Sequence, residues 1–461
     1  MARLESRSKM INPLALIFLL AMCFVMLQSS RRNAVGAILV FAAFIPLGQE
    51  IVVAGLHVYF LRILILAGLV RLLMRHETAG FKPTTVDKFF VGWVMVGFVC
   101  ELIRGPSAQT FGAVYDTFGI YFIVRLLTKE AEDVLCHLRT LAFVAIIIGV
   151  CMTWETINHH DLFYVFGGVP KIPMERDGRF RAQGPFLQTI LAGTFGATLF
   201  PLMIGLWRNG GHGKRLALAG AAGSFVITIA SASSGPLFTF LAALAGFCLW
   251  PMRNKMKLFR RGIVVVIIGL SLVMKAPIWF LIGKISGLTG GGGYYRSYLI
   301  DSFIRHFSQW WLIGTSYTAN WAIAGIVLPN NPNMVDITNH YIAQGIKGGV
   351  LGLSLFLAVI ICCFKIVGRA VRFNTDLSVE QKFLWAFGVC LAAHCTAFIS
   401  VSYFDQINVF WYWLLAVIAA VPIWAAQKPV ENPVPQVAAN INESSVAGAT
   451  TSGESYSTVR Q

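Results

Sequence analysis

Charged side chains are scarce in this sequence. Asp, Glu, Lys and Arg make up 13% of the 461 residues, whereas hydrophobic residues make up 56%, and the mean hydropathy is +0.68. The apolar residues also come in long runs, which the core of a soluble protein does not require. The composition therefore excludes a soluble domain and predicts an all-α, polytopic integral membrane protein.

Acidic residues are scarcer than basic ones, with 21 Asp and Glu against 37 Lys and Arg, so the formal net charge is +16. In a soluble protein such an excess favours a nucleic-acid partner. Here the basic residues lie in short loops between apolar runs, as expected for cytoplasmic loops that face anionic lipid. We therefore expect membrane lipids as partners and no nucleic acid.

The sequence also lacks the patterns that hold metals and nucleotides. Its nine cysteines lie in or beside apolar runs, with no disulfide framework and no zinc spacing. The glycine run 290–293 has neither the preceding strand nor the GK[ST] of a phosphate-binding loop, and no Asp-x-Asp pair occurs outside the apolar runs. We expect no metal and no cofactor.

Apolar runs approach the ~20 residues that a helix needs to cross a bilayer. Strong runs cover residues 11–27, 59–74, 138–152, 187–207, 216–230, 262–274, 349–366, 383–398 and 409–426, and weaker ones cover 34–47, 89–102, 111–127 and 235–249. Together they predict about 12–13 crossings.

Loops rich in Lys and Arg alternate with loops that have almost none, which predicts an orientation. Segment 155–186 and the long loop 282–347 then lie outside. The membrane domain covers residues 1–427, and residues 428–461, rich in Pro and then in Ser, Thr and Gly, predict a disordered cytoplasmic tail. Basic residues on both sides of the first run leave three possibilities for the amino terminus: a shallow hairpin, a first helix that runs inward, or a cleaved signal peptide.

The first outer segment carries Arg176, Arg179 and Arg181 just before a helix that we expect to begin near Pro185. Such a cluster can bind lipid headgroups. It can also capture a phosphate, because the guanidinium fork matches phosphate oxygens and a helix amino terminus adds further donors.

The long outer loop holds Arg296 at the start of a predicted amphipathic helix, 297–307. Aromatic residues follow. They are typical of an interfacial belt, and flat rings also offer stacking surfaces for sugars. They are Trp310, Trp311, Tyr317 and Trp321.

Asp336, Asn339 and His340 lie where the long loop enters the next apolar run. An imidazole that titrates near neutral pH is a natural proton acceptor for an activated hydroxyl. A plain interfacial histidine is the alternative. Farther along, Gly345, Gly349 and Gly352 have spacings that allow close helix packing.

Arg62 interrupts the apolar run 59–74. A charge inside a membrane requires a partner, and we expect Asp116 to be that partner.

These residues together resemble the O-antigen ligase and O-antigen polymerase superfamily, bacterial membrane glycosyltransferases that act on lipid-diphosphate-linked glycans. The resemblance rests on the order of four features along the chain: the RAQGPF stretch 181–186, the serine-rich stretch 231–236, Arg296, and Asn339 followed by Gly349-x-x-Gly352. It implies a GT-C-like helical membrane fold with a large periplasmic loop.

The resemblance also implies roles for individual residues. Arg179 or Arg181, together with Arg296, would hold the donor diphosphate. A histidine directly before the asparagine would be the base, but Thr338 occupies that position here and His340 lies two residues later. His340 can replace it only if the helix begins after residue 340.

We therefore expect a metal-independent, inverting hexosyltransferase at the periplasmic face of the bacterial inner membrane. It would move a glycan from an undecaprenyl-diphosphate-type carrier to an acceptor hydroxyl, with His340 or Asp336 removing the proton, and polymerisation is favoured slightly over ligation. Two alternatives stay open: a transporter of glycans or lipid-linked oligosaccharides, or a non-catalytic subunit that works with polysaccharide export and assembly proteins.

Overall fold

The computed structural model describes residues 12–53, 56–176, 178–209, 213–287, 293–321, 327–328, 331–373 and 378–426. The chain divides into one unit of residues 1–425 and a second of residues 426–461. The expected tail 428–461, the amino-terminal residues 1–11 and most of the glycine run 290–293 lie outside the described residues.

Helices make up almost all of the described secondary structure, which confirms the predicted helical class. The first half contains α1 (Pro13–Gln28), α2 (Arg31–Phe44), α3 (Phe60–Met74), α4 (Thr85–Arg104), α5 (Ala108–Leu127), α6 (Ala131–Asn158), η1 (Leu162–Phe166), α7 (Thr189–Asn209) and α8 (Lys214–Ala230). The second half contains α9 (Ser234–Cys248), η3 (Trp250–Lys255), α10 (Met256–Val273), α11 (Phe280–Gly287), α12 (Gly293–Arg305), α13 (Phe307–Trp310), η4 (Ala319–Trp321), α14 (His340–Phe373), α15 (Ser378–Ala397) and α16 (Ile407–Ala426).

The described sheets are short antiparallel hairpins. They pair β1 (Glu50–Val53) with β2 (Leu56–Tyr59), β3 (Met174–Arg176) with β4 (Arg179–Arg181), and β5 (Val327–Leu328) with β6 (Asn331–Val335).

Among the described residues, four helices are long and apolar enough to cross a membrane: α5, α6, α7 and residues His340–Arg372 of α14. Three shorter apolar helices accompany them. Apolar side chains also face outward along α1 and α6, where Phe24 is 67% and Val150 65% exposed, as expected for helices that contact lipid. The full set of about 12–13 crossings stays a prediction.

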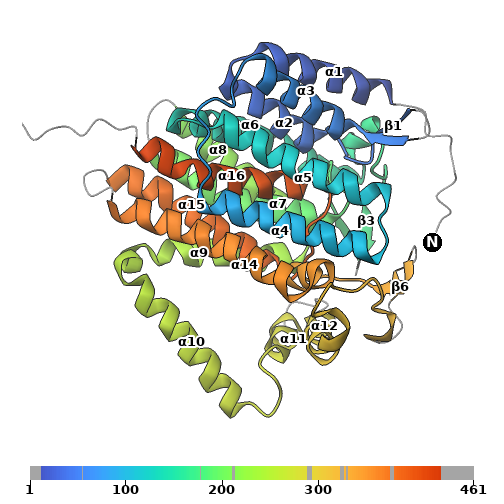
Figure 1. Ribbon diagram of the computed structural model, residues 1–461, viewed down its shortest axis with the longest axis vertical. Coiled ribbons are helices and arrows are strands. Elements are labelled where there is room, and N and C mark those ends of the chain that lie inside the picture. The colour runs from blue at the N-terminus through green and yellow to red at the C-terminus, as the bar shows by residue number, and fades with distance from the viewer. Residues whose placement is uncertain are drawn as a thin grey trace, which may run out of the picture. The chain divides into compact units, whose positions relative to one another are not determined.

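Helices α7, α8, α9, α14, α15 and α16 run through one region of the structure (Figure 1). At one end, the carboxyl terminus of α8 meets the segment before α7, since the Ala182 amide donates to the Ala230 carbonyl, and the start of α14 meets the end of α15, since the His340 amide donates to the Phe398 carbonyl. The opposite ends carry basic residues, including Arg208 on α7, Lys214 on α8 and Arg372 on α14.

The first outer segment folds differently from our expectation. Residues 174–181 form the β3–β4 hairpin, and α7 begins at Thr189 instead of near Pro185. Two positive φ angles explain the path, because Gly178 (φ 71°) turns the hairpin and Gly184 (φ 54°) turns the chain again before the helix. The Glu155 carboxylate at the end of α6 holds this second turn by accepting the amide hydrogens of Gln183 and Gly184 at 2.9 and 2.8 Å.

The long outer segment builds a small core of its own. Helix α12 confirms the predicted helix at 297–307. Trp310 and Trp321 are buried in this core beside Leu299, Val335 and Ile346. These two rings are therefore packing residues and not exposed platforms for sugars, whereas Trp311 and Tyr317 are exposed.

Arg62 on α3 pairs with Asp116 on α5, which confirms Asp116 as the expected partner. Arg62 Nε lies 3.1 Å from Asp116 Oδ1 and Arg62 Nη2 lies 3.2 Å from Oδ2. Both side chains are less than a third exposed. The pair ties α3 to α5 by two charge-assisted hydrogen bonds.

Arg62→Leu should lower the free energy of unfolding by about 1–3 kcal/mol, because it leaves the Asp116 carboxylate without its partner. The double variant Arg62→Leu/Asp116→Leu should be clearly more stable than the single one, since no orphaned charge remains. Thermal unfolding in detergent measures both. Equal stability of the single variant and wild type would show that the pair contributes nothing.

Candidate functional site

A cavity with a volume of about 1200 Å³ lies between the β3–β4 hairpin, α12 and the segment before α14. We call it the arginine cavity. Among its described lining residues, Arg176, Arg179, Arg181 and Arg296 are basic, and Asp336 is the one acidic residue. The three arginines chosen from sequence as diphosphate ligands therefore meet in one space, although more than a hundred residues separate the hairpin from α12.

A serine-rich turn between α8 and α9 positions Arg181. Its Nε donates to the Ser231 carbonyl at 3.4 Å, and its Nη2 donates to the Ser233 hydroxyl. Ser233 in turn donates to the Ser231 carbonyl at 2.9 Å, and Ala232 between them has a positive φ of 44°. The serine-rich stretch thus supports the arginine, a role that its place in the sequence did not reveal.

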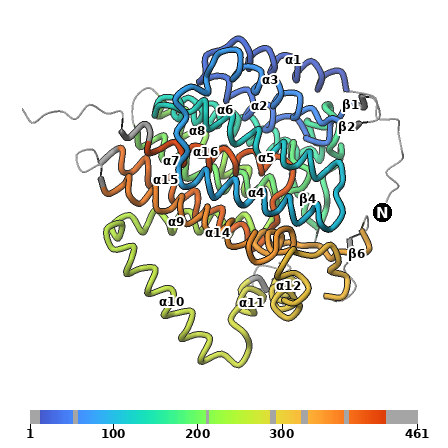
Figure 2. Tube along the Cα trace, viewed as in Figure 1, coloured from blue at the N-terminus to red at the C-terminus, as the bar shows by residue number. Residues whose placement is uncertain are grey.

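Arg296 and Asp336 are brought together by the residue next to Arg296. The Tyr295 hydroxyl donates to the Asp336 backbone carbonyl at 2.5 Å, which fastens α12 to the segment before α14. Burial and the negative charge of Asp336 raise the pKa of the Tyr295 phenol, so the hydroxyl keeps its proton and remains a donor. Figure 2 shows α12 beside the first turns of α14.

The positive charges that line the arginine cavity favour the binding of an anion. Burial and the nearby positive charge of Arg176 lower the pKa of Arg296. Within the described part of the chain, neither the Arg296 nor the Arg179 guanidinium has a hydrogen-bond or ion-pair partner, and both residues line the cavity. Neighbouring cations repel one another, and an anion that binds between them offsets this repulsion.

Asp336 and Thr338 face the same cavity. The Ser402 hydroxyl donates to the Ile337 carbonyl between them at 2.6 Å, which fixes this stretch. The Asp336 side chain is exposed to the cavity, and the protein that surrounds its other sides raises the pKa of the carboxyl by partial burial. The Thr338 hydroxyl is buried without a hydrogen-bond partner among the described residues. The position that the resemblance gives to a base therefore does lie at the arginine cavity.

His340 lies in a second cavity of about 550 Å³, and not in the arginine cavity. Its Nδ1 accepts the Tyr403 amide hydrogen at 3.0 Å, and its Nε2 lies 3.1 Å from Gln344 Nε2. An amide N–H can only donate, so the ring proton must be on Nε2. The imidazole then has no lone pair free for a substrate proton, and its catalytic role stays a prediction that this geometry does not favour.

Asn339 begins α14. Its carbonyl oxygen accepts the Ala343 amide hydrogen at 3.0 Å and its side-chain oxygen accepts the Ile342 amide hydrogen at 3.2 Å, the usual work of an amino-terminal cap. Because the helix begins at His340 itself, residues 338 and 340 point to different cavities.

Two carboxyls near the site were missed in the sequence. Asp405 lines the second cavity and accepts the Leu187 amide hydrogen at 3.2 Å, and burial raises its pKa to about 6. Asp161 precedes η1 and is buried. Its Oδ1 accepts the Phe163 amide hydrogen at 2.8 Å, while its Oδ2 has no partner among the described residues. Isolated carboxyls carry no sequence signal, and only their surroundings distinguish them.

Asp161 should make stability depend on pH. Burial, followed by the negative charge of Glu155, raises its pKa to about 8 in the folded protein, whereas an unfolded chain has an ordinary value near ~3.9. The folded state binds this proton more tightly, so the free energy of unfolding falls as pH rises from about 4 to about 8 and levels off above.

Asp161→Asn should remove this decrease in the free energy of unfolding. The melting temperature of the variant minus that of wild type should therefore increase with pH across this window. Thermal unfolding in detergent at several pH values measures the difference. Glu175→Gln, at an exposed acidic position, should follow wild type. A pH-independent difference for Asp161→Asn would contradict the assignment.

No protein-family model and no curated protein matches this chain. The superfamily resemblance therefore stays a prediction, and the function is argued from the cavities themselves.

Proposed function

We propose that the chain is a polytopic inner-membrane glycosyltransferase of the O-antigen ligase and polymerase type. It transfers a glycan from an undecaprenyl-diphosphate-type carrier to an acceptor hydroxyl in the arginine cavity. The observation that carries the proposal is the meeting of Arg179, Arg181 and Arg296, from two distant segments, around one carboxyl, Asp336. Guanidinium clusters of this kind match the negatively charged oxygens of the two phosphate groups of a diphosphate.

The chemistry needs no metal in this proposal. Asp336 accepts the proton of the acceptor hydroxyl as that oxygen attacks the anomeric carbon from the face opposite the diphosphate. The bond from the anomeric carbon to the phosphate oxygen breaks, the configuration inverts, and the carrier diphosphate leaves. Arg179, Arg181 and Arg296 offset the charge that grows on the leaving group, which is the position where fixed cations contribute most to the rate.

Basic residues next to the short connections at the opposite helix ends support a periplasmic site. The end with Arg208, Lys214 and Arg372 fits the cytoplasm, and the arginine cavity lies at the other end. In a cysteine-free background, Lys171→Cys should react with an impermeant thiol reagent in spheroplasts, whereas Lys257→Cys should react only after disruption. Both positions are exposed. The reverse pattern would overturn the orientation.

The decisive experiment is a transfer assay with the purified chain in lipid nanodiscs. A radiolabelled glycan on an undecaprenyl diphosphate is supplied with unlabelled acceptor glycan, and we expect acceptor-dependent release of carrier diphosphate together with a larger labelled product. A transporter would instead move label across sealed vesicles without forming a new glycosidic bond. A non-catalytic subunit would do neither.

A further inference from the structure

The second cavity borders the arginine cavity. Leu187, Ala343 and Phe404 line both spaces, so groups bound on the two sides would meet at this shared wall. Transfer between two substrates requires such an arrangement, with the reacting atoms about 3–3.5 Å apart. The volumes, about 1200 and about 550 Å³, make the second cavity the smaller partner.

Aromatic rings and hydrogen-bonding groups line the second cavity, together with the carboxyls of Asp405 and of Asp116, which is paired with Arg62. Tyr59, Trp93 and Tyr412 contribute flat faces, and Gln344 and Asn408 contribute amides. The Trp93 indole is fixed by donating to Gln344 Oε1 at 3.0 Å. Ring faces with polar groups at their edges suit a sugar, whose C–H faces stack on aromatic planes while its hydroxyls find partners.

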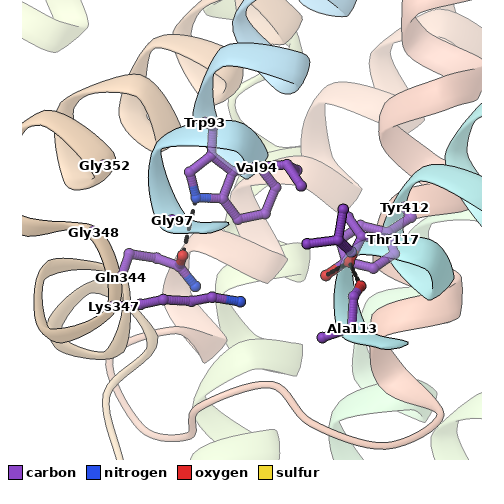
Figure 3. A pocket seen from close by; sticks show the side chains of 11 residues that line it. Trp93, Val94, Gly97, Ala113, Thr117, Gln344, Lys347, Gly348, Gly352 and Tyr412 are labelled. Carbon is purple, nitrogen blue, oxygen red and sulfur yellow. Dashed lines mark hydrogen bonds between the residues drawn. The ribbon is translucent and has the colours of Figure 1, made fainter. Parts of the chain in front are cut away.

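Lys347 brings a positive charge into this space. Figure 3 shows its side chain extending from α14 toward the gap between Trp93 and the Thr117–Tyr412 pair, where a recess of about 30 Å³ opens. The neighbouring cation Arg104 donates to the Ile346 and Lys347 carbonyls, and Arg62 is paired with Asp116. Glu101 attracts Lys347 electrostatically, but among the described residues no carboxylate forms an ion pair with its ammonium. An ionisable side chain inside a spanning helix, directed into a cavity, indicates a ligand.

The hydrogen-bond row beside Lys347 has one donor too many. It runs from the Trp93 indole N–H through the Gln344 amide and the His340 ring to the Tyr403 amide N–H. Both ends donate, and the amide and the neutral ring each offer one acceptor and at least one donor. Whichever way the amide of Gln344 is turned, one donor faces another donor. An oxygen from a ligand in this cavity would satisfy the surplus hydrogen, since buried donors are seldom left unpaired.

We propose that the second cavity binds the acceptor glycan, and that Lys347 pairs with a carboxylate on it, as in a uronic acid. The identification of the bound glycan as the acceptor rests on the proposed function, whereas the carboxylate-sugar site itself does not. One ammonium matches one carboxylate, and the excess donor beside it matches a further sugar oxygen. The sugar stacks on Trp93 and Tyr412 and presents a hydroxyl at the wall formed by Leu187, Ala343 and Phe404.

The test is binding to the full chain in nanodiscs without any lipid-linked donor. Calorimetry with a glucuronate-containing disaccharide and with its carboxyl-reduced, neutral counterpart should show about tenfold tighter binding of the acidic sugar, as expected for one charge-assisted hydrogen bond. Lys347→Gln should abolish the preference, and Lys347→Arg should keep most of it. Lys284→Gln, an exposed lysine that lines neither cavity, is the matched control.

The outcomes separate this site from the proposed function. Arg296→Ala should leave the disaccharide preference unchanged even though transfer fails. A preference in a wild-type chain that shows no transfer would support the carboxylate-sugar site and overturn the glycosyltransferase. Equal binding of acidic and neutral sugars, or equal loss of preference in Lys347→Gln and Lys284→Gln, would overturn the site.

Discussion

Arg296→Ala should slow glycan transfer by roughly two to three orders of magnitude, the usual effect of removing one preorganised charge from a transition state. It should not destabilise the fold. Arg296 has no partner among the described residues, so its loss orphans no carboxylate, and it relieves the repulsion with Arg176 that lowers the pKa of Arg296. A melting temperature equal to or slightly above that of wild type, beside a collapsed rate, is the signature of a binding cation.

The same helix offers a matched control. Arg305 lies on α12 as Arg296 does, is 75% exposed, and pairs with Asp301 in the same helix. Exposed pairs of this kind contribute little to stability, so Arg305→Ala should retain the wild-type rate and melting temperature. Arg296→Lys should recover only a small part of the rate, because a lysine lacks the planar fork. Full recovery with lysine would reduce the site to a generic lipid contact.

The helical class was predictable because it follows from apolar composition, which acts over the whole chain. The Arg62–Asp116 pair was predictable for a related reason: an unpaired charge inside a membrane is costly, and few partners are available. The β3–β4 hairpin was not. It depends on positive φ angles at Gly178 and Gly184, whereas the sequence analysis expected a helix that begins near Pro185.

The break in α14 was also missed. The spacing of Gly345, Gly349 and Gly352 was read as a surface for close helix packing, but Gly348 and Gly349 leave helical geometry, with φ 63° at Gly349. Arg104 accounts for the break from outside the helix, because it donates to the Ile346 and Lys347 carbonyls at 2.6 and 3.0 Å. This contact joins residues that are far apart in the sequence, so the local sequence could not show that the glycines break the helix.

Arg179, Arg181 and Arg296 of the arginine cavity were chosen from the sequence, because guanidiniums in outer segments can bind phosphate. The position of His340 was not predicted, because it depends on where α14 begins. Starting the helix at residue 340 turns the imidazole into the second cavity and leaves Asp336 and Thr338 at the first. A shift of two residues at a helix start thus separates the imidazole from the arginines.

Asp336→Asn should reduce the rate of transfer by roughly 10²–10⁴-fold, the range that general-base catalysis contributes. The amide keeps the size of the side chain but cannot accept the proton. Since partial burial raises the pKa of the Asp336 carboxyl and only the ionised form is a base, the wild-type rate should rise with pH, with a midpoint above the ordinary carboxyl value. Product formation over a pH series with saturating donor measures both effects.

His340 provides the opposing test of the same assignment. Its ring holds the Tyr403 amide through Nδ1 and contacts Gln344 through Nε2, so His340→Gln should lower the melting temperature while the surviving folded protein keeps most of its turnover rate and the wild-type pH midpoint. Asp336→Asn should do the reverse, with an unchanged melting temperature and a lost rate. If His340→Gln is folded and inactive while Asp336→Asn still turns over, the proton acceptor is the imidazole, and the cavity that holds His340 is the one where the bond forms.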